Sequence, residues 1–217
     1  MLPKLKLAVF ILCAIPAGQL AYDAYTGDLG VNPIETITRF TGSWSLIFLL
    51  TSLAITPLRR LTGRNELIKF RRMLGLFAFF YASLHFATYI GLDLFFDFTA
   101  IGKDIVKRPY ITAGFTAFVV MVPLALTSTA GMIRRLGKHW QKLHRLVYVA
   151  AIVGVIHFYW LVKADIRRPA QYAAVLALLL GFRLLTKWRP RIAARFALRS
   201  TSSSPGIIAG KDAETSK

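Results

Sequence analysis

The chain has 217 residues, of which 55% are hydrophobic and only 18% are charged, and its net charge is +18. Soluble domains carry about 25% charged residues, so this composition excludes an ordinary soluble domain, a disordered chain and a collagen-like fibre. The single cysteine, Cys13, excludes an intrachain disulfide and a cysteine-based zinc cluster.

Long apolar segments divided by basic ones dominate the chain. A membrane-spanning helix needs about 20 mostly apolar residues, and six segments approach that length: roughly 5–22, 44–58, 73–92, 111–127, 143–162 and 170–185. The second is short and can be extended by residues 38–41, and Pro123 in the fourth is tolerated if neighbouring helices satisfy the freed carbonyl. No internal repeat is recognisable. The sequence therefore predicts an all-α polytopic membrane protein, a six-helix transmembrane bundle.

The first segment could alternatively be a cleaved signal peptide, because Lys4 and Lys6 precede a short apolar stretch. Pro16 and Gly18 interrupt that stretch, and no clean small-residue cleavage site follows it. We therefore expect a retained first helix.

Basic residues alternate with the apolar segments in a way that predicts topology. If six helices cross the membrane, one side holds 21 basic and three acidic residues, whereas the other holds seven of each. Cytoplasmic loops carry the excess of lysine and arginine, so both termini are predicted to be cytoplasmic. The basic side should also contact anionic lipid headgroups, and we prefer this explanation of the net charge to nucleic-acid binding. The predicted bundle covers residues 1–190, and residues 191–217, basic and then serine-rich, are predicted to form a disordered cytoplasmic tail.

Two of the four histidines fall deep inside predicted helices, where ionisable residues are costly and usually functional. At about 1.5 Å per residue, His85 lies about 20 Å beyond Arg72 and His157 about 18 Å beyond Arg145. Both helices start from the basic side, so the two imidazoles should reach one level. We expect them to ligate one metal ion from opposite sides, with haem as the candidate, because bundle cores hold such cofactors. The alternative is a pair of buried histidines satisfied by backbone carbonyls.

Small residues lie about one and two turns before each histidine: Ala82 and Ala78 before His85, with Gly75 continuing that side, and Gly154 and Ala150 before His157. They could let a flat macrocycle approach, but close helix packing explains such stripes at least as well.

The other two histidines belong to the basic side. His144 lies about 20 Å from His157 along the helix, so it cannot share the same haem. It could ligate a second haem, contact a flavin, or simply be solvated at the interface. His139 lies among Lys138, Trp140 and Lys142, and we expect it to be solvated.

Two of these histidine-bearing segments resemble a known family. Residues 71–78, RRMLGLFA, continuing to Tyr81 and His85, resemble the third helix of ferric-reductase-like transmembrane domains. Residues 140–148, WQKLHRLVY, followed by His157, resemble the fifth. The length, the six segments and the lack of a soluble domain narrow the resemblance to the MsrQ (YedZ) family, the haem-binding membrane subunits of periplasmic methionine sulfoxide reductase systems.

The resemblance implies b-type haem, one or two per chain, with His85, His144 and His157 as iron ligands. It also implies FMN near the cytoplasmic side, a bacterial inner membrane, and a periplasmic molybdopterin-containing catalytic subunit as partner. The wider superfamily has two histidines on each of the two helices, but here Arg71 stands where the fourth is expected. The resemblance therefore supplies no second histidine for a haem at His144.

The sequence thus suggests a subunit that carries electrons across the membrane through haem bound by His85 and His157. No GxGxxG motif follows a strand, so a flavin reductase or the quinol pool must supply the electrons. Sulfoxide reduction is expected in the partner, since nothing here suggests a catalytic cysteine or a molybdenum ligand. A histidine-dependent proton or metal-ion transporter and a haem-free assembly protein are the alternatives.

Overall fold

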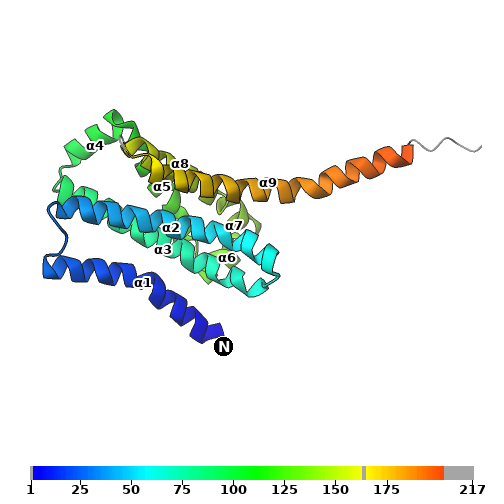
Figure 1. The fold of residues 1–217 in the computed structure, drawn as a ribbon, viewed down its shortest axis with the longest axis horizontal. Helices are drawn as coiled ribbons and strands as arrows, with labels where there is room; N and C mark the ends of the chain where they lie inside the picture. Colours follow the sequence, from blue (N-terminus) through cyan, green and yellow to red (C-terminus); the bar gives the residue numbers. More distant parts are fainter. Residues whose placement is uncertain (1, 163–164, 203–217) are drawn as a thin grey trace, which may run out of the picture. The chain divides into compact units, whose positions relative to one another are not determined.

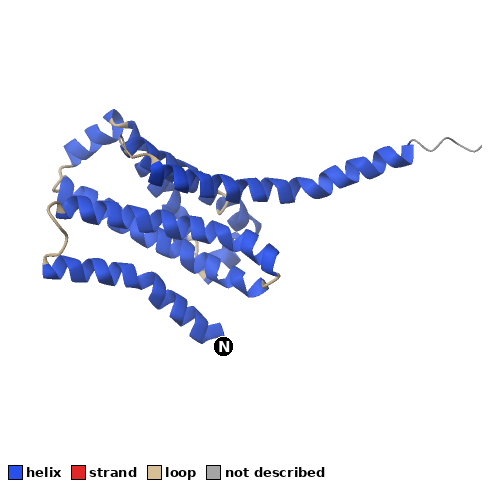
Figure 2. Ribbon diagram, in the orientation of Figure 1, coloured by secondary structure: helices blue, strands red, loops and turns tan. Residues whose placement is uncertain are grey.

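The computed structural model describes residues 2–162 and 165–202. In this part of the chain every regular element is a helix, and short loops join them (Figures 1 and 2). The elements in chain order are α1 (Leu2–Thr26), α2 (Pro33–Thr62), η1 (Asn65–Leu67), α3 (Ile68–Thr88), η2 (Tyr89–Asp93), α4 (Phe98–Lys107), α5 (Pro109–Leu126), α6 (Ala130–Leu136), α7 (Lys138–Leu143), α8 (Leu146–Leu161) and α9 (Arg167–Ser202).

Six helical segments among the described residues are long and apolar enough to cross a membrane, which confirms the predicted all-α polytopic class. The second begins at Pro33, well before the predicted start at Trp44. Pro33 occupies the first helical position, and the Asn32 side chain accepts a hydrogen bond from the Glu35 amide at 3.3 Å. This cap starts the helix in a polar stretch that hydropathy alone does not mark.

Two antiparallel helix pairs form the centre of the fold: α2 packs along α3, and α5 packs along α8 (Figure 1). Weaker contacts of α3 with α5 and of α2 with α8 join the pairs. We call the end that carries η1, α6 and α7 the basic end, and the end that carries η2 and α4 the neutral end. In both pairs the first helix runs towards the basic end and the second returns, so the arrangement repeats without inversion. The sequence alone showed no such repeat.

Helix α1 is joined to the α2–α3 pair by Tyr81, whose side chain is fully buried. Its hydroxyl accepts a hydrogen bond from the Ala17 amide and donates one to the Cys13 carbonyl, both at 2.9 Å. Those two groups would otherwise bond to each other within the helix, and Pro16 next to them removes another backbone donor. A proline and a side chain inserted between backbone partners both bend helices, which accounts for the bend of α1 in Figure 1.

The chain divides into two units after Leu179, and every residue of the site described below lies in the first. Helix α9 continues through Pro190 to Ser202, so residues 191–202 of the predicted tail are helical here, consistent with the good helix formers alanine, leucine and arginine in that stretch. The remainder of the predicted tail, 203–217, lies outside the described residues.

Candidate functional site

The structure brings His85 of α3 and His157 of α8 together. Their ring centroids are 6.1 Å apart, and the ring planes are inclined by 74°. Depth along each helix predicted that the two imidazoles reach one level, and the packing of the two helix pairs brings them together edge to face. We call these two side chains the paired-histidine site.

Each imidazole is held by a backbone carbonyl of the other helix in its own pair. His85 Nδ1 lies 2.9 Å from the Thr38 carbonyl oxygen of α2. His157 Nδ1 lies 2.6 Å from the Tyr110 carbonyl oxygen of α5. A carbonyl oxygen can only accept, so Nδ1 carries the proton in both rings and donates it. In a neutral imidazole the other nitrogen, Nε2, then keeps its lone pair.

The separation of the rings is suited to an ion between them. Metal–imidazole bonds are about 2 Å long, and the centre of each ring lies roughly 1 Å behind its nitrogen, so two imidazoles on one ion have centroids roughly 6 Å apart. The observed 6.1 Å agrees with that estimate. Two neutral imidazoles in an apolar bundle are donors that could hold haem iron, so the residues present fit that group.

Two glycines complete the paired-histidine site, and the sequence analysis missed both. A Cβ atom on Gly42 of α2 would lie 3.0 Å from His85 Nδ1, and one on Gly114 of α5 would lie 2.8 Å from two atoms of the His157 ring. Each glycine comes one helical turn after the residue whose carbonyl binds the histidine. Once the structure identifies the carbonyl partners, the same spacing appears in both pairs, since each histidine follows its partner by 47 residues.

Two of the small residues singled out from the sequence, Ala78 and Gly154, lie at contacts between helices, whereas Gly75 lines the cavity described below. A Cβ on Gly154 would lie 3.3 Å from the Leu46 side chain of α2, whereas a Cβ on Gly75 would have no atom within 4 Å. The Ala78 carbonyl accepts a hydrogen bond from the Ser45 hydroxyl at 3.0 Å. These contacts join α2 to α3 and α8.

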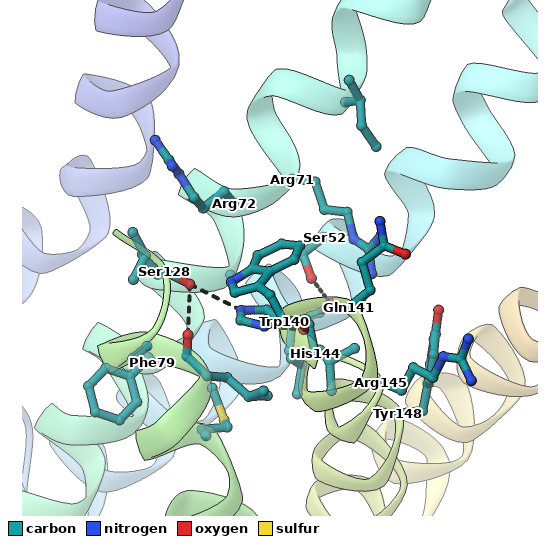
Figure 3. A pocket seen from close by; sticks show the side chains of 18 residues that line it. Ser52, Arg71, Arg72, Phe79, Ser128, Trp140, Gln141, His144, Arg145 and Tyr148 are labelled. Atoms are coloured by element: carbon teal, nitrogen blue, oxygen red, sulfur yellow. Dashed lines mark hydrogen bonds between the residues drawn. The ribbon is translucent and has the colours of Figure 1, made fainter. Parts of the chain in front are cut away.

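A cavity of about 430 Å³ opens between the helix pairs at the basic end. We call it the basic cavity. Apolar side chains of α2, α3, α5 and α8 contribute to its lining. Its polar and aromatic lining residues, all labelled in Figure 3, are Ser52, Arg71, Arg72, Phe79, Ser128, Trp140, Gln141, His144, Arg145 and Tyr148.

His144 is the histidine of this cavity, and it is held less firmly than the paired histidines. Its ring stacks on Trp140 with a centroid distance of 3.9 Å, as Figure 3 shows. Its Nδ1 lies 3.2 Å from the carbonyl of the same Trp140, and its Nε2 lies 3.4 Å from the Ser128 hydroxyl. That hydroxyl donates its single proton to the Leu124 carbonyl at 2.7 Å, so its contact with His144 is long and weak.

Two further residues that the sequence singled out, His139 and Arg71, lie at the basic end. His139, on α7, is exposed, as expected for a solvated residue. Arg71, which stands where the wider superfamily has a histidine, lines the basic cavity together with His144. The structure therefore brings His85 and His157 together and places His144 in a separate cavity that arginines also line.

Comparison with known proteins identifies the relatives of this architecture. Residues 41–155 match the family described as ferric reductase like transmembrane component. The chain is 53% identical over 193 residues to the protein-methionine-sulfoxide reductase heme-binding subunit MsrQ of Herminiimonas arsenicoxydans, with 88% of each chain covered. It is 54% identical over 191 residues to the protein of the same name from Rhodospirillum rubrum, covering 88% of this chain and 92% of the relative. No solved structure matches the chain significantly.

Proposed function

This chain belongs to the MsrQ family within the ferric-reductase-like transmembrane proteins, and from that premise we propose that it carries electrons across a bacterial inner membrane through b-type haem. The acceptor is a periplasmic, molybdopterin-containing subunit that reduces methionine sulfoxide in proteins. The observation that carries the proposal is the pair of imidazoles with centroids 6.1 Å apart, each with its Nδ1–H bound to a backbone carbonyl.

His85 and His157 would hold haem through the ring nitrogens left free of hydrogen bonds to carbonyls, and the iron would supply the one-electron chemistry. The protein residues have three tasks in this proposal. The carbonyls of Thr38 and Tyr110 orient the two rings and keep the ligating nitrogens deprotonated. The surrounding apolar helices exclude water and lower the local dielectric.

The charge distribution supports an orientation for the chain. The basic end carries the excess of lysine and arginine, and such residues stay in the cytoplasm. Both termini are therefore cytoplasmic, and the basic end faces the cytoplasm and its anionic lipid headgroups. Electrons enter at the basic end and leave at the neutral end, where the periplasmic subunit binds.

The basic cavity is the entry point for electrons in this proposal. Arg71, Arg72 and Arg145 line it, and arginine side chains bind phosphates and carboxylates by paired hydrogen bonds. Such a lining would bind the phosphate of FMN or the carboxylates of a second haem. A second haem at His144 would need another iron ligand, but Arg71 and not a second histidine lines the cavity with it. This favours the flavin. A cytoplasmic flavin reductase, or quinol from the membrane, then supplies the electrons.

The first test is a spectrum of the purified protein, with haem quantitation by pyridine haemochrome. We expect reduced b-haem bands in the wild type, and loss of most bound haem in His85→Ala and His157→Ala. The control is His139→Ala, which alters an exposed histidine on α7. A wild type without haem bands would leave the transporter and assembly-protein alternatives and would end this proposal.

A further inference from the structure

The two imidazoles of the paired-histidine site are held by the same construction on both sides. Each Nδ1 donates to a carbonyl of the partner helix, at 2.9 Å for Thr38 and 2.6 Å for Tyr110. The glycine one turn later on the same helix leaves the space into which the ring fits. Two independent helix pairs, α2–α3 and α5–α8, show this arrangement with the same 47-residue spacing between histidine and carbonyl.

Among the glycines of the described membrane-spanning helices, only Gly42 and Gly114 have an imidazole ring within 4 Å of an added Cβ. At Gly114 an added Cβ would lie 2.8 Å from ring atoms of His157, closer than real Cβ contacts, and at Gly42 it would lie 3.0 Å from His85. Gly18 and Gly75 have nothing within 4 Å of an added Cβ. At Gly154 the neighbouring atom is the end of a flexible leucine side chain.

The consequence for an iron ligand is electronic as well as steric. A hydrogen bond from the second ring nitrogen fixes the orientation of a metal-bound histidine and makes it a stronger base. A more basic ligand favours ferric over ferrous iron, and hydrogen bonding behind the ligands is one of the means by which proteins set haem potentials. A ring pushed off its carbonyl would lose this effect while keeping its imidazole.

We propose that Gly42 and Gly114 are positioning residues of the paired-histidine site: they admit each imidazole to a backbone carbonyl of the neighbouring helix and thereby set ligand strength and reduction potential. This inference rests on the proposed function, because it assumes that iron is bound between the two rings. It differs from simple close packing of helices, which would change stability and leave the iron's properties alone.

The test compares Gly42→Ala and Gly114→Ala with Gly18→Ala in the purified full-length protein. Gly18 is a matched control, since it lies in a membrane-spanning helix and has open space around it. For each variant, haem content, the electron paramagnetic resonance spectrum of the oxidised protein and the midpoint potential are measured. These readouts do not depend on sulfoxide reductase activity.

We expect the two alanine variants to bind haem about ten-fold more weakly, the typical cost of losing a partner behind a metal ligand. We also expect altered low-spin signals and a higher potential. A ten-fold loss of preference for ferric iron corresponds to about 59 mV for one electron. Gly114→Ala should have the larger effect, because its added Cβ would lie closer to the ring. Gly18→Ala should match the wild type.

Unchanged spectra and potentials in both variants, with only the thermal midpoint lowered, would overturn the inference and leave a packing role. If neither variant accumulates, electron–nuclear double resonance on the wild type tests whether the Nδ1 protons of the two histidines are hydrogen-bonded. Two strongly hydrogen-bonded protons support the inference, and their absence overturns it. A wild type and a Gly18→Ala variant that both lack haem would instead refute the proposed function, so the two failures are distinguishable.

Discussion

The paired-histidine site and the basic cavity hold their histidines in opposite ways. At the first, two imidazoles from different helix pairs face each other, and each is bound to a carbonyl of a neighbouring helix. At the second, His144 follows α7 directly, its Nδ1 contacts the carbonyl of Trp140 in that same short helix, and it shares a cavity of about 430 Å³ with arginines.

This difference indicates a division of labour within one bundle. Ligands held by the backbone of neighbouring helices cannot move independently, which suits an iron that must change charge with little rearrangement. A cavity with a weakly hydrogen-bonded imidazole and three arginines suits an anionic cofactor or donor that binds at the basic end. The following variants test that division, from the largest expected effect to the smallest.

His144→Ala should separate the two regions most clearly. We expect it to retain the haem of the paired-histidine site, with its spectrum and potential, and to lose most of whatever cofactor the basic cavity holds. Haemochrome and flavin fluorescence on one preparation measure both. His85→Ala is the comparison, with the opposite pattern expected. Complete loss of haem from His144→Ala would contradict the separation of the two sites.

Arg71→Gln removes a half-buried guanidinium from the basic cavity. A hydrogen bond to a charged group contributes about 1.5 kcal/mol, so we expect about ten-fold weaker binding of FMN, measured by titration of its fluorescence. Arg134→Gln is the control, because Arg134 is exposed on α6 at the same end. Equal FMN affinity in both variants would show that Arg71 does not bind the phosphate.

Tyr81→Phe tests whether α1 contributes to the paired-histidine site. Loss of the hydroxyl removes two hydrogen bonds that tie α1 to α3, and each such bond contributes about 1 kcal/mol. We expect a lower thermal midpoint and normal haem content, since the histidines are held by α2 and α5. Tyr22→Phe, at an exposed position of α1, should change neither. A large loss of haem from Tyr81→Phe would mean that the site depends on α1.

His139→Ala should have the smallest effect. His139 is exposed on α7, so we expect wild-type haem content, flavin binding and stability. Any loss of haem from this variant would show that the basic end contributes a ligand that the present assignment overlooks.

Much of this protein could be predicted from its sequence because membrane helices obey strong constraints. An apolar stretch of sufficient length must satisfy its own backbone hydrogen bonds, so hydropathy predicted six helices, and helix rise placed His85 and His157 at one level. The early start of α2 at Pro33 was missed, because its first turns are polar and depend on a local cap at Asn32. The sequence left Gly154 open between a cofactor surface and helix packing, and the structure places it near Leu46 of α2.

The sequence by itself determined the helical class, the uneven distribution of charge and the depth of each histidine, since these follow from composition and from a fixed rise per residue. Only the tertiary structure decided which helices pair, because several packings are compatible with the same apolar surfaces. That pairing chose the carbonyls of Thr38 and Tyr110 as partners of the histidines. It also made Gly42 and Gly114 the places where a single methyl group would collide with an imidazole ring.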